Sequence, residues 1–185
     1  GYIGSHMALG LLDRGEDVVV IDNLVTGIAA QVPAGAVFAQ GDIRDQALVR
    51  RLLDDHRIDA VVHFAGSTVV PESVANPLKY YANNTAATRD LLEVCTAAGV
   101  DKVIFSSTAA VYGVTDADLI DENAEKAPAS PYGRSKLMSE AMLADLAAAT
   151  PLRYVALRYF NVAGADPQQR TGQSTPGATH LIKRA

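Results

Sequence analysis

Hydrophobic and polar positions along the chain switch repeatedly between two periods. Helical spacing, in which apolar residues recur every three or four positions, is clear where Leu48, Val49, Leu52 and Leu53 cluster. Between the helical stretches lie short β-branched runs, such as DVVVID, that read as buried strands. The pattern predicts helices over 7–15, 45–56, 76–99 and 130–150, and strands over 17–22, 36–42, 58–66, 102–107 and 152–160.

This alternation of strands and helices predicts the fold class. Parallel strands joined by helices form a sheet whose two faces are both covered, which explains near-continuous apolar strands. We therefore expect an α/β protein with a doubly wound, Rossmann-like parallel sheet. Gly15 is placed to end the first helix, and Ser130 with Pro131 to begin the last one. Ligands of such sheets bind at the carboxyl ends of the strands, so candidate residues are expected there.

The composition is that of a folded globular protein. Of the 185 residues, 49% are hydrophobic and 20% are charged, which excludes a mainly disordered chain. No apolar run approaches the roughly 18 residues of a membrane span. The net charge of −5 argues against a nucleic-acid partner. The histidines lack metal-ligand spacing, so no metal is expected, and Cys95 is the only cysteine, which favours a reducing, cytoplasmic location.

Glycines stand at the start of the chain, directly before a helix. Gly1 and Gly4, in GYIG, have the spacing of the second half of a dinucleotide-binding fingerprint. Backbone N–H groups at such a helix start attract phosphate, because glycine permits close approach and the helix dipole favours negative charge. A plain tight turn is the alternative, and this pair of glycines does not decide between the two.

Acidic residues end the next two predicted strands. Asp22 stands 21 positions after Gly1, the spacing of a carboxylate that binds adenosine ribose hydroxyls. Its charge would repel a 2′-phosphate, and Asn23 and its neighbours offer no arginine to hold one, so NAD is favoured over NADP. Asp42 is a candidate acceptor for the adenine amino group, with Ile43 packed on the ring. Ordinary turn aspartates are the alternative at both positions.

The third and fourth predicted strands end in small and hydroxyl-bearing residues. Phe64, Ala65 and Gly66 follow the third strand, where small residues permit close approach of a cofactor or simply begin a loop. Ser106 and Thr108 lie at the end of the fourth. A hydroxyl there can bridge a substrate oxygen and a base, as part of an oxyanion-stabilising arrangement.

A tyrosine and a lysine share one face of the last predicted helix. Tyr132 and Lys136, in YGRSK, are four positions apart. A tyrosine with its ordinary pKa of about 10 is a poor base at neutral pH, but a neighbouring ammonium favours the phenolate and lowers that pKa. We therefore expect Lys136 to lower the pKa of Tyr132, which then takes the hydroxyl proton of an alcohol that loses hydride.

Taken in order, these motifs resemble the extended short-chain dehydrogenase/reductase family. The motifs are GYIGSH, DVVVIDNL, GDIRD, VVHFAG, VIFSSTAAVYG, SPYGRSK and LRYFNVAGADP, and they extend along essentially the whole chain. The resemblance implies a tightly held NAD. From spacing and resemblance together, the expected cofactor-binding residues are Gly1, Tyr2, Ile3, Gly4, Asp22, Asn23, Asp42, Ile43, Phe64, Ala65, Gly66, Asn83, Ser106, Tyr132, Lys136 and Phe160. The expected catalytic residues are Thr108, Tyr132 and Lys136, and the expected substrate contacts are Thr108, Tyr132 and Asn161.

Within that family the motifs are most similar to those of enzymes that epimerise UDP-sugars at C4, which implies an isomerase of galactose metabolism. By this resemblance Tyr132 removes the 4-hydroxyl proton while C4 gives hydride to NAD, the 4-keto sugar turns over, and hydride returns to its other face. Lys136 keeps the tyrosine ionised and binds the nicotinamide ribose. UDP-glucose and UDP-galactose are the expected substrates, with UDP-N-acetylhexosamines and UDP-pentoses as alternatives.

Two positions depart from the family pattern, and two other functions compete. Thr68 stands where some members carry lysine, and Gly177 where relatives often carry asparagine, which concerns a pyrophosphate-side cation and a uridine-side contact. A 4,6-dehydratase needs a further acid and base, but Ala109 and Ala110 follow Thr108. A non-catalytic dinucleotide-sensing regulator can dispense with the Tyr–Lys pair that this chain keeps.

The two ends of the sequence lie inside motifs. GYIG falls within the phosphate-binding loop, and HLIKRA reads as the opening of a helix. We therefore expect an NAD-binding domain over 1–165 that lacks its first, central strand, and the start of a nucleotide-sugar region over 166–185. The family suggests a homodimer through the two long helices. The chain alone is expected to be unstable or inactive, because a missing central strand exposes two sheet edges.

Overall fold

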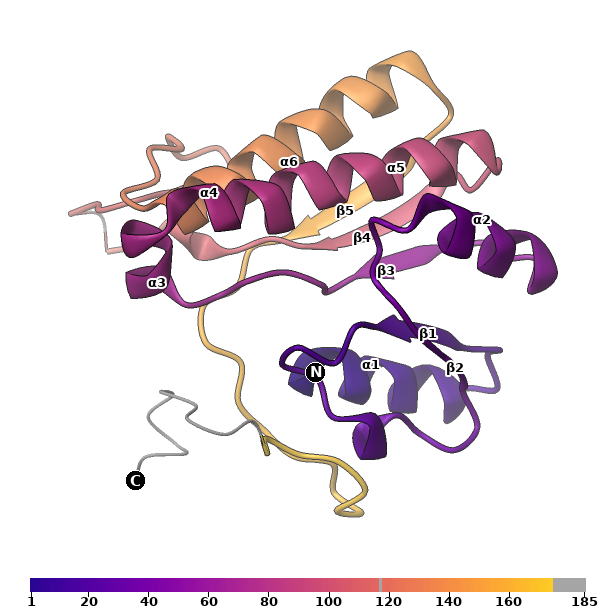
Figure 1. The fold of residues 1–185 in the computed structure, drawn as a ribbon. Helices are drawn as coiled ribbons and strands as arrows, with labels where there is room; N and C mark the ends of the chain where they lie inside the picture. The colour runs from indigo at the N-terminus through magenta and orange to yellow at the C-terminus, as the bar shows by residue number, and fades with distance from the viewer. Residues whose placement is uncertain (117, 175–185) are drawn as a thin grey trace. The chain divides into compact units, whose positions relative to one another are not determined.

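The computed structural model describes residues 1–116 and 118–174, which form two compact units (Figure 1). The first unit comprises Gly1–Asp45 and the chain from Asn161 onward, and the second comprises Gln46–Phe160. These are divisions of the backbone, and the expected functional boundary at residue 165 stays a prediction.

The first unit contains one long helix and two paired strands. Helix α1 (Tyr2–Leu12) precedes β1 (Val19–Asp22) and β2 (Val37–Gln40), with a 3₁₀ turn at Ala29–Gln31 between the strands. The strands are parallel, and Asp22 is in register with Gln40. Arg170 joins the later segment to α1, because Nη1 and Nη2 donate to the two carboxylate oxygens of Asp13 at 2.9 and 2.8 Å.

The second unit holds a three-stranded parallel sheet in the order β3-β4-β5, namely Val61–His63, Lys102–Ser106 and Arg153–Leu157. Helices α5 (Ala87–Ala97) and α6 (Pro131–Ala149) lie side by side over one face of this sheet, and α2 (Gln46–Asp55) packs against α5 (Figure 1). The buried core between helices and sheet consists of Leu92, Val103, Phe105, Leu143 and Leu152. On the opposite face Val155 is 53% exposed, so the helices within this unit cover one face.

The long helix predicted over 76–99 is interrupted by a π-helical turn. It comprises α4 (Pro77–Tyr80), the π turn Tyr81–Ala86 and α5, and the short helix α3 (Val70–Ala75) precedes it where a loop was expected. A π turn accommodates one extra residue and turns side chains away from the ordinary helical stripe. Periodicity alone does not reveal such a turn, because the flanking helices keep the usual spacing.

The predicted α/β class with parallel strands is confirmed, and each predicted strand appears with shorter bounds. Helix α1 begins at Tyr2 rather than Met7, so GYIG forms the cap and first turn of the helix. The strands belong to two sheets rather than one, and in the described part of the chain β1 and β3 each pair with a strand on one side only. Ser130 caps α6 as predicted, since its Oγ accepts from the N–H of Gly133 at 3.2 Å.

Candidate functional site

In the first unit, the start of α1 carries the residues predicted to bind phosphate. Gly1 is the N-cap and no side chain caps the helix, while Tyr2, Ile3 and Gly4 form its first turn. The first N–H groups of a helix have no intrahelical partner, so they are free to meet an anion. The Tyr2 hydroxyl donates to the carbonyl of Gly164 at 2.6 Å. The backbone of this turn, rather than the phenol, therefore suits a phosphate.

The Asp22 carboxylate lies at the carboxyl end of β1. Its Oδ1 accepts from the N–H of Leu24 at 2.8 Å, in a turn where Leu24 has a left-handed φ of 60°. Its Oδ2 accepts from the backbone nitrogen of Gly1 at 3.1 Å. A Cβ on Gly27 would lie 2.6 Å from both carboxylate oxygens, so glycine keeps side-chain atoms out of the space beside them. A carboxylate with such a cradle fits the two hydroxyls of an adenosine ribose.

The Asp42 carboxylate, by contrast, is occupied by partners within the chain. Arg44 Nε and Nη2 donate to its oxygens at 2.9 and 2.8 Å, and Asn23 Nδ2 donates at 3.1 Å. The hydrogen bonds from Arg44 hold the pKa of Asp42 far below its ordinary value. Ile43 is buried. An adenine amino group at Asp42 would therefore share acceptor oxygens with Arg44, and Ile43 offers little surface to a ring.

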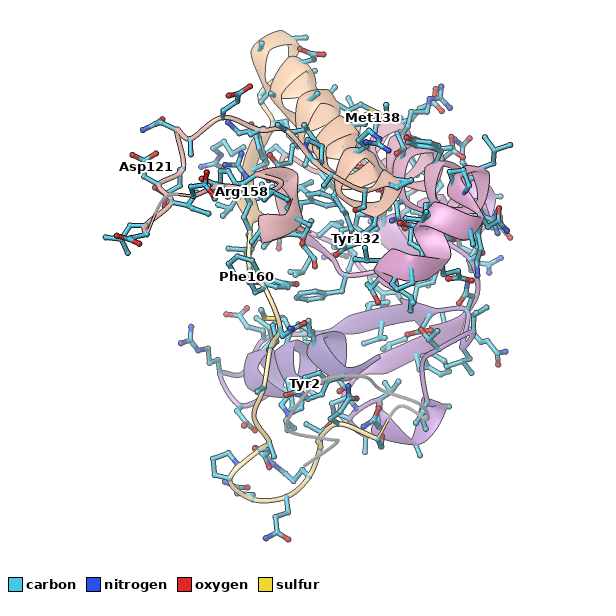
Figure 2. The ribbon with its side chains drawn as sticks, turned by 90° about the vertical axis from the view of Figure 1, so that its left-hand side faces the viewer. Tyr2, Asp121, Tyr132, Met138, Arg158 and Phe160 are labelled. Carbon is cyan, nitrogen blue, oxygen red and sulfur yellow. The ribbon has the colours of Figure 1, made fainter. Side chains whose placement is uncertain are left out.

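In the second unit, the predicted catalytic side chains meet where β4 ends and α6 begins. Thr108 and Tyr132 come together here, and hydrogen bonding by the Thr108 side chain acts to lower the pKa of the Tyr132 phenol. Lys136 Nζ donates to the carbonyl of Ser106 at 3.0 Å. Helix α6 approaches this closely because residue 133 is glycine, whose Cβ would lie only 2.6 Å from the carbonyl oxygen of Ala110. Figure 2 shows Tyr132 near the start of this helix.

Burial raises the pKa of Tyr132, and this outweighs the lowering effect of its hydrogen bond with Thr108. Burial likewise lowers the pKa of Lys136 to about 8. The Lys136 side chain is 3% exposed, and Nζ lies 4.9 Å from the ring centroid of Phe105. The net pKa of Tyr132 is therefore raised rather than lowered in this structure, because desolvation disfavours the charged form, and the lowering effect expected from Lys136 stays a prediction.

The loop after β3 passes directly over the lysine. Gly66 has a φ of 154°, and a Cβ on it would lie 3.0 Å from Asn84 Oδ1 and 3.3 Å from Lys136 Nζ. A side chain there would be strained and crowded, which explains the glycine. Ala65 is exposed, and Asn83 Nδ2 donates to Ser67 Oγ at 3.0 Å. The loop thus presents backbone and small side chains beside Lys136, as a cofactor-lining loop requires.

The buried Asn84 is a site residue that the sequence analysis missed. It lies in the π turn, where Oδ1 accepts from the N–H of Ser67 at 2.7 Å and Nδ2 donates to the Ser67 carbonyl at 3.0 Å. Nδ2 also donates to Ser135 Oγ at 3.0 Å. Asn84 therefore fixes the loop after β3 against α6. The paired asparagines in an otherwise amphipathic helix were the available signal.

Residues after β5 complete the described candidates. The hydroxyls of Tyr159 and Ser106 are hydrogen-bonded. Phe160 is 77% exposed, and Asn161 is exposed. Thr68, where some relatives carry lysine, is also exposed, whereas Gly177 lies outside the described residues.

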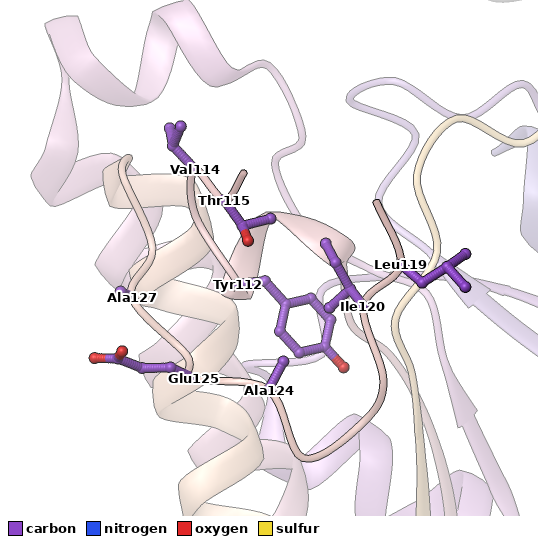
Figure 3. Close-up of a pocket in the computed structure, with 8 residues that line it drawn as sticks. All are labelled: Tyr112, Val114, Thr115, Leu119, Ile120, Ala124, Glu125 and Ala127. Atoms are coloured by element: carbon purple, nitrogen blue, oxygen red, sulfur yellow. The ribbon is translucent and has the colours of Figure 1, made fainter. Parts of the chain in front are cut away.

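A cavity of about 150 Å³ lies apart from the Tyr132 side chain, in the loop after β4 (Figure 3). Its walls include Tyr112, Leu119, Ile120 and Ala124. In the part of the chain that the structure describes, no cluster of three metal-binding side chains occurs, and no helix has the length and apolarity needed to cross a membrane.

Comparison with known proteins gives a consistent result. The NAD dependent epimerase/dehydratase family matches residues 1–185. The UDP-glucose 4-epimerase of Azospirillum brasilense is 58% identical over 185 residues, which are 100% of this chain and 53% of that protein. The UDP-glucose 4-epimerase of Lacticaseibacillus casei is 47% identical over 98% of this chain and 55% of its own length. The chain therefore spans about half the length of the curated relatives it matches.

Solved structures agree. The UDP-glucose 4-epimerase of Brucella ovis in complex with NAD has a TM-score of 0.96 and 48% identity, covering 100% of this chain and 57% of that one. The enzyme of Bifidobacterium longum in complex with NAD⁺ and UDP has a TM-score of 0.90 and 38% identity, covering 96% and 56%. The resemblance inferred from the motifs is thus confirmed along the whole chain.

Proposed function

Because the chain belongs to the NAD dependent epimerase/dehydratase family, we propose that the complete protein is an isomerase that inverts C4 of a UDP-sugar, with UDP-glucose and UDP-galactose as its substrate pair. The observation that carries this proposal is the placement of Thr108 and Tyr132 together beside the buried Lys136. That arrangement is suited to moving one proton to and from an alcohol. The names of the relatives supply the substrate class.

Residues of both units suit an NAD cofactor. In the first unit, the uncapped start of α1 suits the pyrophosphate and Asp22 suits the adenosine ribose. In the second, the Gly66 loop, Asn83 and Lys136 suit the nicotinamide half. NAD held by these residues would supply the acceptor for the hydride of C4 and the donor for its return. The remaining cofactor and substrate residues, Ser106, Phe64, Ala65, Phe160 and Asn161 among them, are proposed in the roles that the motifs predict.

Tyr132 performs the proton transfer in this proposal. As the phenolate it accepts the proton of the sugar 4-hydroxyl, and as the phenol it returns that proton to the 4-keto oxygen. Burial opposes the phenolate. The Thr108 hydroxyl and the positive charge of Lys136 are the groups that stabilise it, and with a pKa of about 8 Lys136 is mostly an ammonium at neutral pH. The proton balance closes over the cycle, so no external acid or base is consumed.

Dehydration is the less favoured chemistry for this site. Loss of water from C5 and C6 requires an acid and a base in addition to the tyrosine. Ala109 and Ala110, which follow Thr108, form a 3₁₀ turn and offer neither. The nearby Glu140 carboxylate is bound by Ser107 and Arg158. The site is therefore equipped for reversible proton transfer at one hydroxyl.

The deciding experiment is to express the complete protein and follow UDP-galactose without added NAD. Formation of UDP-glucose supports the proposal, and a 4-keto-6-deoxy sugar nucleotide would indicate a dehydratase instead. Bound NAD without turnover of UDP-galactose, UDP-N-acetylgalactosamine or a UDP-pentose would indicate a dinucleotide-sensing regulator. The relative rates on these three substrates define the preferred sugar.

We also propose that the complete protein is a cytoplasmic homodimer that associates through the two long helices. Leu78 in α4 is 76% exposed and Met138 in α6 is 47% exposed, and such apolar side chains suit a helix-to-helix interface. Cys95 is a free thiol, as in a reducing compartment. Light scattering on the purified protein measures the assembly, and a Leu78→Glu variant is expected to be monomeric. Cell fractionation measures the location.

A further inference from the structure

A buried carboxylate that the proposed chemistry does not use lies on the catalytic face of α6. Glu140 follows Lys136 by one helical turn and Tyr132 by two, and it is 6% exposed. Arg158 forms a two-point ion pair with it, in which Nε donates to Oε1 at 3.0 Å and Nη2 donates to Oε2 at 2.7 Å. Ser107 Oγ also donates to Oε1. Both carboxylate oxygens are therefore satisfied by partners from two other segments.

Those two segments are the ones that carry the remaining catalytic groups. Ser107 stands between Ser106, whose carbonyl accepts from the lysine, and Thr108, whose hydroxyl meets Tyr132. Arg158 directly precedes Tyr159, whose hydroxyl bonds to Ser106 and whose carbonyl accepts from the N–H of Ala109 at 3.1 Å. One side chain of α6 thus ties the ends of β4 and β5 to the helix that carries the base.

Arg158 extends the network to the loop after β4. Its Nη1 donates to the Tyr112 hydroxyl at 2.8 Å and to the carbonyl of Glu122 at 3.1 Å. The guanidinium carbon lies 5.2 Å from the Tyr112 ring centroid. Figure 2 shows Arg158 beside the loop that carries Asp121. The planar guanidinium can make these contacts at once because its donors are fixed in a fork.

We propose that Glu140 and Arg158 are positioning residues for the proton transfer, acting through Ser107 on Thr108 and through the shared helix on Tyr132 and Lys136. This inference rests on the proposed function. Neither residue touches the reacting atoms. Their contribution is geometric, because proton transfer is efficient only when donor and acceptor are within hydrogen-bond reach. A displacement of about 1 Å at such a site lowers the rate by about a hundredfold.

The test is the Glu140→Gln variant of the complete protein, which keeps the side-chain shape but removes the charge that orients Arg158. We expect kcat for UDP-galactose to fall by about ten- to a hundredfold, with KM and the amount of bound NAD unchanged. Because the Thr108 hydrogen bond lowers the pKa of Tyr132, loss of that bond raises it. The limb of the kcat profile that rises with pH therefore moves to higher pH in the variant.

Two further variants separate positioning from stability. Ser107→Ala removes only the hydroxyl that links Glu140 to the β4 end, and it is expected to lower kcat in the same way but less. Val100→Ala truncates a buried side chain outside the network, so it lowers the unfolding temperature and leaves kcat and its pH profile unchanged. This control shows that destabilisation alone does not imitate the effect.

Several outcomes would overturn the inference. Glu140→Gln with wild-type kcat and pH profile shows a merely structural ion pair, and a raised KM or lost NAD shows a binding role instead. A wild-type protein without epimerase activity refutes the proposed function, but not the positioning role of Glu140 and Arg158. In that case amide hydrogen exchange tests the positioning role. Faster exchange at Ser107 and Thr108 in Glu140→Gln supports it, and unchanged exchange refutes it.

Discussion

The two units hold their candidate residues by different means. In the first unit, Asp22 and Asp42 stand in turns at strand ends, and most contacts that orient them come from residues a few positions away or next to the neighbouring strand, with one more from the start of α1. In the second unit, the groups around Tyr132 come from α6, from the π turn and from the segments where β3, β4 and β5 end, and most are buried. One arrangement is local and open, and the other is long-range and enclosed.

The difference fits the role proposed for each group. Recognition of ribose and phosphate needs backbone N–H groups and one carboxylate, which short turns supply. Proton transfer needs a tyrosine, a hydroxyl and an ammonium held within hydrogen-bond distance and shielded from water, which a single turn cannot supply. Changes in the second unit should therefore affect rate and stability most, and changes in the first should affect cofactor choice.

The largest effect is expected from removing the base. Tyr132→Phe deletes the proton acceptor and should lower kcat by about 10²- to 10⁴-fold. Bound NAD, measured in the purified protein, should remain because the ring is kept. Tyr154→Phe makes the same change at a half-buried tyrosine in the core of the same unit and should be fully active. Equal activity of the two variants would show that the base has been assigned wrongly.

The next largest effect is expected from removing a buried aromatic ring, and the same substitution can be compared in the two units. Phe105 is 0% exposed in the second unit, whereas Phe38 is 36% exposed in the first. Phe105→Ala should lower the free energy of unfolding by about 3–5 kcal/mol, through lost burial and the cavity left behind. Phe38→Ala should lower it by about 1–2 kcal/mol, because much of the ring is already in water. Denaturant titration of both variants measures this, and equal losses would contradict the contrast between the units.

The sequence predicts the local features well in both units. The strand–helix order, the Ser130 cap and the place of Asp22 each depend on residues within one turn or strand, so their pattern is visible along the chain. The Tyr132–Lys136 pair was likewise predicted, since four positions on a helix define one face.

The long-range features could not be predicted in this way. The Glu140–Arg158 pair joins residues 18 positions apart that meet only once α6 and β5 are packed together. The π turn that directs Asn84 into the site leaves the hydrophobic spacing on either side unchanged. The raised pKa of Tyr132 depends on burial, which no spacing of tyrosine and lysine records.

A moderate effect with opposite signs on activity and stability is expected at Lys136. Burial of its ammonium lowers its pKa to about 8 from an ordinary 10.5, so the charge opposes folding at neutral pH. Lys136→Met should therefore raise the free energy of unfolding at pH 7 by about 1–3 kcal/mol while activity is lost.

The sign of this change in stability can be checked by varying the pH. Between pH 8 and 10.5 the unfolded lysine holds a proton that the native lysine has lost, so the wild type gains stability as pH rises through this window. The Met variant lacks that gain, so its excess in free energy of unfolding over the wild type should shrink as the pH rises. Thermal unfolding at pH 7 and pH 10 measures it. A Met variant that is less stable at pH 7 would show that the hydrogen bond to Ser106 outweighs the burial of the charge.

The smallest effect is expected in the first unit, at Asp22. Asp22→Asn keeps an oxygen that can accept from the N–H of Leu24 and removes the charge, so the turn should persist. Charge-assisted hydrogen bonds are about twice as strong as neutral ones, and NAD affinity should fall by about tenfold. NADP should bind better than before, because its 2′-phosphate no longer meets a carboxylate. Asp17→Asn, at an exposed aspartate of the same unit, should change neither affinity. Calorimetry on the cofactor-stripped protein measures both, and unchanged NADP affinity in Asp22→Asn would place the adenosine ribose elsewhere than beside Asp22.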